Sequence, residues 1–230
     1  MLFRSSVATY IGHGSSTSWV SSGFNVSDIH RLSNGNKLPV IWSVACVNGN
    51  FVKYDECFAE AWLRKTGGGA VAVEAASTNE SWVPPCDKQA ATINAMIKKT
   101  YSTFGALEAV GVIAALKNWG DSNSSEGNKL AEQCVLFGDC ALEVRTGVSR
   151  DINVNVSKGY GDVVVNVSSD ARAVADATVT VYNKDMTYIV TGETDDSGNV
   201  TLSLQDAPVG ELLYTVSGQN LNAQVDKVLE

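Results

Sequence analysis

Two stretches of the chain decide its fold: residues 6–14, Ser-Val-Ala-Thr-Tyr-Ile-Gly-His-Gly, and residues 38–46, Leu-Pro-Val-Ile-Trp-Ser-Val-Ala-Cys. Each opens with an apolar run of strand length and closes with a chemically reactive side chain. We predict strands over 6–11 and 38–44, because continuous apolar runs are typical of strands buried on both faces of a parallel sheet. Parallel strands need crossover connections, so helices are expected on each side of the sheet. The fold class predicted for this part of the chain is α/β.

The sequence around these runs alternates between helical and strand patterns. A short helix is predicted over 27–32, with Asn25 or Ser27 as its N-cap, and a third strand over 70–75 after the glycine run 67–69. Amphipathic helices are predicted over 57–65, 87–101 and 107–119. This order predicts a three-layer α/β/α domain with a mostly parallel sheet.

The second part of the chain has a different pattern. Residues 148–230 contain 16 valines, alternate with a period of two in runs such as 162–167 and 178–182, and carry turn signals at 195–198 and 208–210. Six or seven short strands at this spacing predict a small antiparallel β-sandwich. We therefore predict two domains, over 1–147 and 148–230.

Charge and composition exclude several classes of partner. The 230 residues carry 17 Lys and Arg against 25 Asp and Glu, a net charge of −8, whereas nucleic acids and anionic membranes bind basic surfaces. The apolar stretches are broken well before the roughly 18 residues typical of a membrane span. With two His and no C-x-x-C pair there is little from which to build a zinc site, so we assign no metal ligands and expect no required cofactor.

His13 and Cys46 lie where the two predicted strands end. The carboxyl ends of parallel strands border the ligand crevice of an open α/β sheet, and neighbouring strands run roughly 4.8 Å apart. A thiol is mostly protonated at neutral pH unless a nearby imidazole takes its proton. The pair therefore indicates nucleophilic catalysis, with the backbone N–H groups of Gly14 and Cys46 as candidate oxyanion donors. The structural alternatives are a small buried thiol and a simple Gly-His-Gly turn.

Several blocks of the first part resemble the gingipain family of cysteine peptidases. They occur in that family's order and at similar spacing over nearly all of residues 1–150: Tyr10-Ile-Gly-His-Gly-Ser15, Ala45-Cys-Val-Asn-Gly-Asn-Phe51, Cys57-Phe-Ala-Glu-Ala61, Ala76-Ser-Thr-Asn-Glu-Ser-Trp82, Phe137-Gly-Asp139 and Val144-Arg-Thr146. Strands ending in His-Gly and Ala-Cys are also shared by the wider caspase-like clan. The resemblance implies a caspase-like sandwich, an immunoglobulin-like domain directly after it, and a bacterial protein that is secreted or held at the cell surface.

The resemblance also implies roles for individual residues. Cys46 matches the nucleophile, His13 the general base and acid, and Gly14 with Cys46 the oxyanion hole. Trp82 matches an aromatic lid on the pocket for the P1 side chain, and Glu80 stands where an arginine-cleaving member has a glutamine. A carboxylate there favours a cationic P1 residue through charge-assisted hydrogen bonds. A packed loop aromatic and a solvated loop charge are the structural alternatives for Trp82 and Glu80.

The chain departs from the family in what precedes His13. Gingipain-like enzymes have a long segment there that completes the sheet, supplies an acidic group orienting the histidine and forms the acidic floor of the P1 pocket, whereas twelve residues precede His13 here. The resemblance therefore predicts a C-terminal part of a larger enzyme, with a missing segment or another chain completing the sheet.

Two functions follow. The first is a cysteine endopeptidase acting on proteins or peptides after basic residues through a Cys-His dyad. The alternative is a degenerate peptidase-like module for adhesion or binding. In the sandwich, Asp195, Asp196 and Asn199 crowd one turn and offer hard oxygen ligands to a structural calcium ion, although a solvated hairpin turn accounts for them better.

Overall fold

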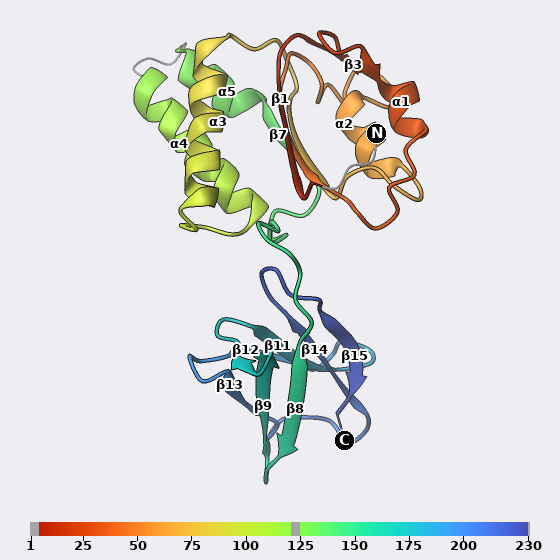
Figure 1. Ribbon diagram of the computed structural model, residues 1–230, viewed down its shortest axis with the longest axis vertical. Coiled ribbons are helices and arrows are strands. Elements are labelled where there is room, and N and C mark those ends of the chain that lie inside the picture. Colours follow the sequence, from red (N-terminus) through yellow and green to blue (C-terminus); the bar gives the residue numbers. More distant parts are fainter. Residues whose placement is uncertain (1–4, 121–124, 230) are drawn as a thin grey trace. The chain divides into compact units, whose positions relative to one another are not determined.

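The computed structural model describes residues 5–120 and 125–229 (Figure 1). The chain divides into two compact units, and the boundary along the chain lies between Thr146 and Gly147. The first unit combines helices and strands, and the second is built of strands. Within the described part of the chain, no helix combines the length and the apolar character needed to cross a membrane.

A four-stranded sheet forms the centre of the first unit. Its strand order is β1 (Val7–Ile11), β5 (Val40–Val44), β6 (Ala72–Ala76) and β7 (Cys134–Phe137). The first three strands are parallel, and β7 runs antiparallel to β6. All residues of β5 and β6 are buried, as expected for strands covered on both faces, whereas β1 is the half-buried outer strand of the described sheet. The predicted α/β class with a parallel sheet is therefore confirmed.

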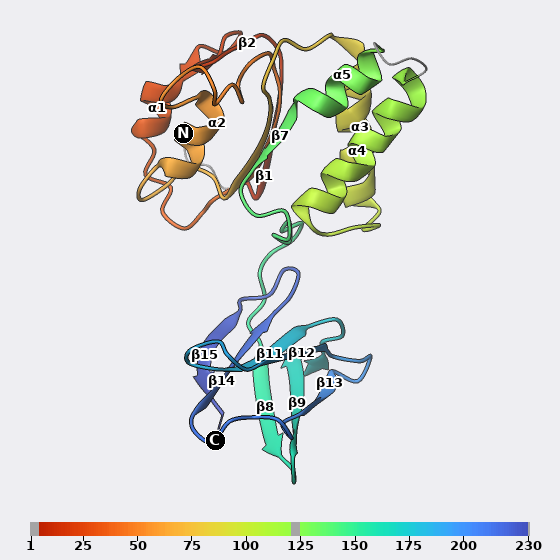
Figure 2. The same ribbon diagram turned by 180° about the vertical axis from the view of Figure 1, so that it is seen from behind.

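Helices cover both faces of this sheet. One face carries α1 (Val26–His30) and α2 (Phe58–Arg64), and the other carries α3 (Val83–Ile97), α4 (Phe104–Trp119) and α5 (Glu126–Gln133), as both ribbon views show (Figures 1 and 2). Because strand side chains alternate between faces, Ile41 packs with the α2 side and its neighbour Trp42 with the α4 side. The unit thus has three layers.

The helix ends show where local chemistry shifted the predicted boundaries. Asn25 is the N-cap of α1, because its side chain accepts hydrogen bonds from the N–H groups of Ser27 and Asp28. Helix α3 begins four residues earlier than predicted, since Pro84 and Pro85 occupy its first turn, where no intrahelical N–H bond is needed. It ends at Ile97, followed closely by Lys99 in the left-handed backbone region.

Some elements escaped prediction. Helix α5 is a polar segment of eight residues, and the apolar strand β7 of four residues follows it directly. A small antiparallel sheet of β2 (Gly14–Ser15), β3 (Ser18–Trp19) and β4 (Phe24–Asn25) follows His13. Strands of two residues carry too few side chains to show an alternation. These short strands nevertheless determine where the segment after His13 lies.

The second unit consists of two four-stranded antiparallel sheets. One contains β8 (Asn153–Lys158), β9 (Asp162–Ser169), β10 (Arg172–Ala173) and β13 (Asn199–Ser203), and the other contains β11 (Thr178–Asn183), β12 (Ile189–Glu193), β14 (Leu212–Ser217) and β15 (Gln224–Val228). Alternate valines fill the core, among them Val163, Val165 and Val167 of β9. The described strands number eight, against the six or seven predicted.

The Asp195 turn of this unit is held by its own backbone. The Asp195 carboxylate accepts hydrogen bonds from the N–H groups of Ser197 and Asn199, at 2.9 Å each, and Gly198 adopts a positive φ. These bonds account for the acidic turn through local chemistry. The calcium ion suggested for Asp195, Asp196 and Asn199 stays a prediction.

A buried cluster of charges joins α3, α4 and β6. The Lys88 ammonium lies 2.8 Å from a Glu74 oxygen and 2.6 Å from a Glu108 oxygen, and all three side chains are almost completely buried. The Trp42 indole N–H donates to the other Glu108 oxygen at 3.1 Å. A single ammonium thus serves two carboxyl groups in a medium that strongly disfavours unpaired charge.

Replacing Lys88 by Met is expected to destabilise the first unit by about 3–5 kcal/mol at about pH 8, because two buried carboxyl groups lose their cation. Burial raises the pKa of Glu74, opposed by Lys88 and reinforced by Glu108. The Glu74 carboxyl group therefore keeps its proton in the folded state at pH values above 4.5, where the unfolded chain has released it. As the pH rises above 4.5, the folded state loses stability relative to the unfolded chain. Without Lys88 the Glu74 pKa rises further, so the deficit should be smaller at about pH 5.

Denaturant unfolding followed by tryptophan fluorescence measures the stability of the first unit, since all five tryptophans lie in it. The control Lys98→Met changes an exposed lysine at the end of the same helix and should shift stability by no more than about 0.5 kcal/mol. If Lys88→Met lowered the free energy of unfolding by the same amount at about pH 5 and at about pH 8, the proposed protonation of Glu74 in the folded variant would be contradicted.

Candidate active site

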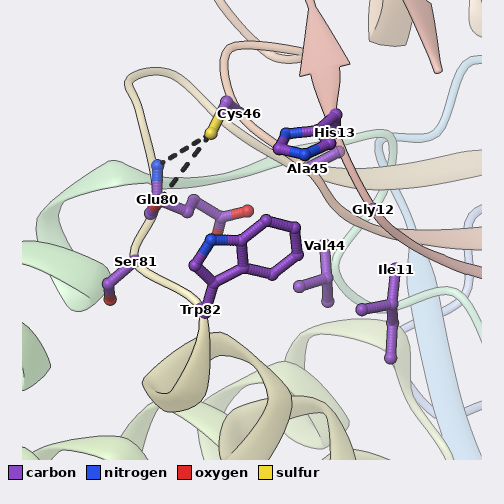
Figure 3. A pocket seen from close by; sticks show the side chains of 9 residues that line it. All are labelled: Ile11, Gly12, His13, Val44, Ala45, Cys46, Glu80, Ser81 and Trp82. Atoms are coloured by element: carbon purple, nitrogen blue, oxygen red, sulfur yellow. Dashed lines mark hydrogen bonds between the residues drawn. The ribbon is translucent and has the colours of Figure 1, made fainter. Parts of the chain in front are cut away.

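His13 follows β1 in a segment fixed by backbone hydrogen bonds. The N–H of Gly12 donates to the carbonyl of Val44 at 3.1 Å, which extends the pairing of β1 with β5. The His13 carbonyl accepts from the Tyr10 hydroxyl at 2.9 Å, and its N–H donates to the Ser21 hydroxyl at 3.2 Å. The backbone of His13 is therefore held on both sides while its side chain borders open space (Figure 3).

Cys46 follows β5 at a strained turn. The next residue, Val47, has a φ of 53°, a left-handed conformation that β-branched residues rarely adopt. Its N–H donates to the Thr78 carbonyl at 3.0 Å, and this bond helps to hold the strained backbone. Strain of this kind concentrates at functional sites, where the surrounding structure maintains it.

The Cys46 thiol contacts the backbone of Glu80. The N–H of Glu80 donates to Sγ at 3.3 Å, and Sγ lies 3.7 Å from the Glu80 carbonyl (Figure 3). The N–H and the carbonyl of one loop residue thus both contact the sulfur. The loop after β6 therefore both borders the thiol and supplies a donor to it.

Gly14 brings the two reactive segments into contact. A Cβ atom at this position would lie 2.5 Å from the Cys46 carbonyl oxygen and 3.0 Å from the Cys46 nitrogen, so another side chain does not fit there. The backbones of Gly14 and Cys46 are thus in van der Waals contact. Their service as oxyanion donors stays a prediction, and this close approach is the geometry that it requires.

One cavity of about 160 Å³ collects four of the five residues predicted for the site. It is lined by Ile11, Gly12, His13, Val44, Ala45, Cys46, Glu80, Ser81 and Trp82 (Figure 3). The Trp82 indole is 59% exposed and meets the His13 imidazole edge to face, with ring centroids 5.0 Å apart. The predicted nucleophile, base, lid and carboxylate therefore face a common space, and Gly14 adjoins it through Cys46.

Glu80 is a half-buried residue whose side chain lies at this cavity. Burial raises its pKa to about 7, while the Lys88 charge and a hydrogen bond from the Ala45 backbone act in the opposite direction. Its Oε2 atom is buried and has no hydrogen-bond partner among the described residues. An unpaired buried carboxylate oxygen beside a cavity fits a ligand that brings a positive charge and N–H donors. The solvated loop charge is thus the weaker interpretation of Glu80.

The other cysteines lie outside this cavity. All five cysteines fall within the described residues and carry free thiols. Cys57 is fully buried at the start of α2, and burial raises the pKa of its thiol to about 11. The thiol of Cys134 lies within 4.8 Å of carboxylate oxygens of Glu74 and Glu108, which is a metal-like cluster, but the Lys88 ammonium already supplies the cation there.

Sequence reasoning missed part of the site. Val44 and Ala45 line the cavity at the end of β5, where a strand end indicates them, and Ser81 lines it between the predicted residues Glu80 and Trp82. Ser43 and Asn48 are buried polar residues; Ser43 directly precedes the cavity residue Val44, and Asn48 lies two positions after Cys46. An asparagine in a turn after a strand has a common local explanation, which is why the sequence alone did not single it out.

Comparison with known proteins gives a consistent family assignment. The model of peptidase family C25 matches residues 5–145. Gingipain R1 of Porphyromonas gingivalis is 33% identical over 213 residues, covering 84% of this chain and 21% of its own length. Gingipain R2 of the same species is 34% identical over 195 residues, covering 76% of this chain and 26% of its own. The chain therefore spans about a quarter of the length of these relatives.

Solved structures agree. The Arg-specific cysteine proteinase gingipain R superposes with a TM-score of 0.81 at 29% identity, over 96% of this chain and 52% of that chain. A complex of pro- and mature gingipain domains from Porphyromonas gingivalis gives 0.82 at 30% identity, over 96% and 53%. The resemblance to gingipains drawn from the sequence motifs is confirmed.

Replacing Gly14 by Ala is expected to push the His13 and Cys46 segments apart, because the new methyl group would overlap the Cys46 backbone. Overpacking of this kind costs about 1–3 kcal/mol. Tryptophan-monitored unfolding should detect that loss, and alkylation of Cys46 should be slower at neutral pH. Gly147→Ala is the control for the alkylation rate, since it lies in the second unit and a Cβ atom there would come no closer than 3.4 Å to any residue beyond its chain neighbours. Equal behaviour of the two variants would contradict the close approach.

Proposed function

Because the chain belongs to peptidase family C25, we propose that it hydrolyses peptide bonds as a cysteine endopeptidase, with Cys46 as nucleophile and His13 as general base and acid. The observation that carries the proposal is the common cavity of these two side chains at the carboxyl ends of neighbouring parallel strands. Ligands of open α/β sheets bind at that end. The cavity supplies the nucleophile, the proton carrier and a charged contact for substrate in one place.

The proposed reaction follows from the groups at the cavity. The Cys46 sulfur forms a bond to the scissile carbonyl carbon as His13 takes the thiol proton, and the developing oxyanion is stabilised by the N–H groups of Gly14 and Cys46. When the C–N bond breaks, His13 gives its proton to the departing amine. A water molecule, deprotonated by His13, then attacks the thioester, releases the carboxylic acid and restores the thiol. Each proton that His13 accepts is thereby returned.

Glu80 and Trp82 are proposed to select a basic P1 side chain. The unpartnered Glu80 oxygen offers a charge-assisted bond to a guanidinium or ammonium group, and the exposed Trp82 ring offers an aromatic face to its apolar stem. The solved relative is an Arg-specific proteinase, which supports the same preference here. The substrates would then be proteins or peptides cleaved after Arg or Lys, with no required cofactor.

The remaining assignments concern the surroundings of this site. We propose that the β-sandwich is immunoglobulin-like and that the protein is secreted or displayed at the cell surface, as the resemblance of its sequence motifs to the gingipain family implies. We also propose that a further segment or chain packs beside β1 and supplies the acidic group that orients His13. The chain covers about half of the gingipain R chain that it matches, and β1 is an outer strand of the described sheet.

An arginyl chloromethyl ketone is expected to add one label at Cys46, since the reagent combines a basic P1 group with an electrophilic carbon. Peptide mapping by mass spectrometry locates the label, and Cys140, an exposed thiol, reports on unspecific alkylation. His13→Ala should slow labelling of Cys46 at neutral pH by about tenfold or more, because the group proposed to take the thiol proton is then absent. If the Cys46 thiol is intact but reacts with neither the arginyl nor the lysyl chloromethyl ketone, the basic P1 preference is overturned. If Cys46→Ala left the turnover of a peptide substrate unchanged, the non-catalytic binding module would be favoured.

The preference for a basic P1 group should depend on pH through Glu80. Burial holds the pKa of Glu80 at about 7, so its carboxyl group is neutral below that pH and charged above it. The rate ratio of an arginyl to a norleucyl chloromethyl ketone is expected to rise by about tenfold between about pH 6 and pH 8, the size of one charge-assisted hydrogen bond. Both reagents attack Cys46, so the titration of the thiol cancels in the ratio. Glu80→Gln should flatten the ratio, and a variant that kept the rise would exclude Glu80 as its cause.

A further inference from the structure

We propose that Asn48 is a positioning residue that holds the histidine segment against the cysteine segment. It lies two residues after Cys46 and is completely buried. The role rests on the proposed function, because Asn48 acts through the arrangement of His13 and Cys46 and does not line the cavity itself.

The Asn48 amide bridges the two segments. Its Nδ2 donates to the carbonyl of Ser15 at 2.6 Å and to the carbonyl of Ser18 at 3.0 Å. These two carbonyls belong to the β2–β3 hairpin, which begins at Gly14, directly after His13. Asn48 therefore joins the turn that carries the thiol to the hairpin that carries the imidazole.

The orientation of this amide is fixed from the other side. The Ser43 hydroxyl of β5 donates to Asn48 Oδ1 at 2.7 Å and accepts from the Trp19 indole N–H at 2.8 Å. Trp19 belongs to β3 and packs in the core against rings of α2. The amide thus has a partner for each of its two donors and for its oxygen, all contributed by the strand and hairpin elements that frame the site.

The backbone of Asn48 adds a second connection. Its carbonyl accepts from the N–H of Ala59 at 3.0 Å, and the Ser16 carbonyl accepts from the N–H of Phe58 at 2.7 Å. Both donors lie at the start of α2, where N–H groups have no partner within the helix. The cysteine turn and the histidine hairpin are consequently attached to each other directly and also through the same helix end.

Asparagine is the side chain that this position requires. Two inward-facing carbonyls need donors, and a buried hydroxyl needs an acceptor, which a planar amide supplies together. A shorter or apolar side chain would take the amide donor away from these two half-buried carbonyls, and the hairpin would lose its attachment to the cysteine turn. Because Gly14 touches the Cys46 backbone, a shift of the hairpin changes the separation of imidazole and thiol.

The pH dependence of Cys46 alkylation tests this role without substrate. Iodoacetamide reacts with thiolate, so a thiol paired with His13 keeps reacting at mildly acidic pH, whereas an unpaired thiol does not. In the 230-residue protein, Asn48→Ser is expected to lower the rate at about pH 6 by about tenfold relative to the parent chain and to leave the rate at about pH 9 nearly unchanged. Ser43→Ala, which frees the amide to turn, should shift the profile in the same direction. It supplies the test if Asn48→Ser does not fold.

The control and the outcomes separate positioning from stability. Leu107→Ala opens the core on the opposite face of the sheet, so it should lower stability while keeping the parent pH profile. If the parent chain and His13→Ala have the same profile, the Cys-His pair itself is wrong and the role of Asn48 is wrong with it. If the parent chain reacts at mildly acidic pH and Asn48→Ser and Ser43→Ala do so equally well, the pair stands and only the positioning role is overturned.

Discussion

The parallel pairing of β1 with β5 is the constraint on which the site depends. The register aligns Ile11 of β1 with Val44 of β5. His13 comes two positions after Ile11, and Cys46 comes two positions after Val44. Equal offsets at the same end of adjacent strands bring the two residues to one edge of the sheet. A shift of the register by one residue would also turn every side chain of β1 to the opposite face, so burial of the sheet fixes the register as firmly as the hydrogen bonds do.

Charge at the site is governed by burial and not by the net charge of the protein. Of the net charge of −8, residues 148–230 account for −7, since they carry 5 basic and 12 acidic residues, and residues 1–147 account for −1, with 12 and 13. Lys88 is the cation whose charge opposes the raised pKa of both Glu74 and Glu80. Above about pH 7, where the Glu80 carboxyl group is charged, the cavity can therefore favour a cation although the domain as a whole is nearly neutral.

The sequence predicted the architecture well where patterns are long. Strands β1, β5 and β6 and helix α2 were found close to their observed bounds, because buried apolar runs and the turn glycines 67–69 mark them clearly. Helix α5 and strand β7 have eight and four residues and follow each other directly, so neither shows a repeated period, and the two-residue strands after His13 are too short to show one. The cavity residues were identified through the strand ends and the family motifs. What they could not give is the burial of Glu80, which arises from packing of segments distant in the sequence.

Close approach and firm attachment are both needed at the cysteine turn, and different residues provide them. Gly14 allows the hairpin to touch the Cys46 backbone, but a glycine contact has no side chain to hold it. Val47 meanwhile adopts a strained conformation that would relax if the turn were free. Asn48 opposes both a shift of the hairpin and a relaxation of the turn, since either movement would break hydrogen bonds of its buried side-chain amide. The sequence Cys46-Val47-Asn48 thus places the reactive atom, the strained residue and the residue that holds the hairpin within one turn, which ties the geometry of the nucleophile to the core of the domain.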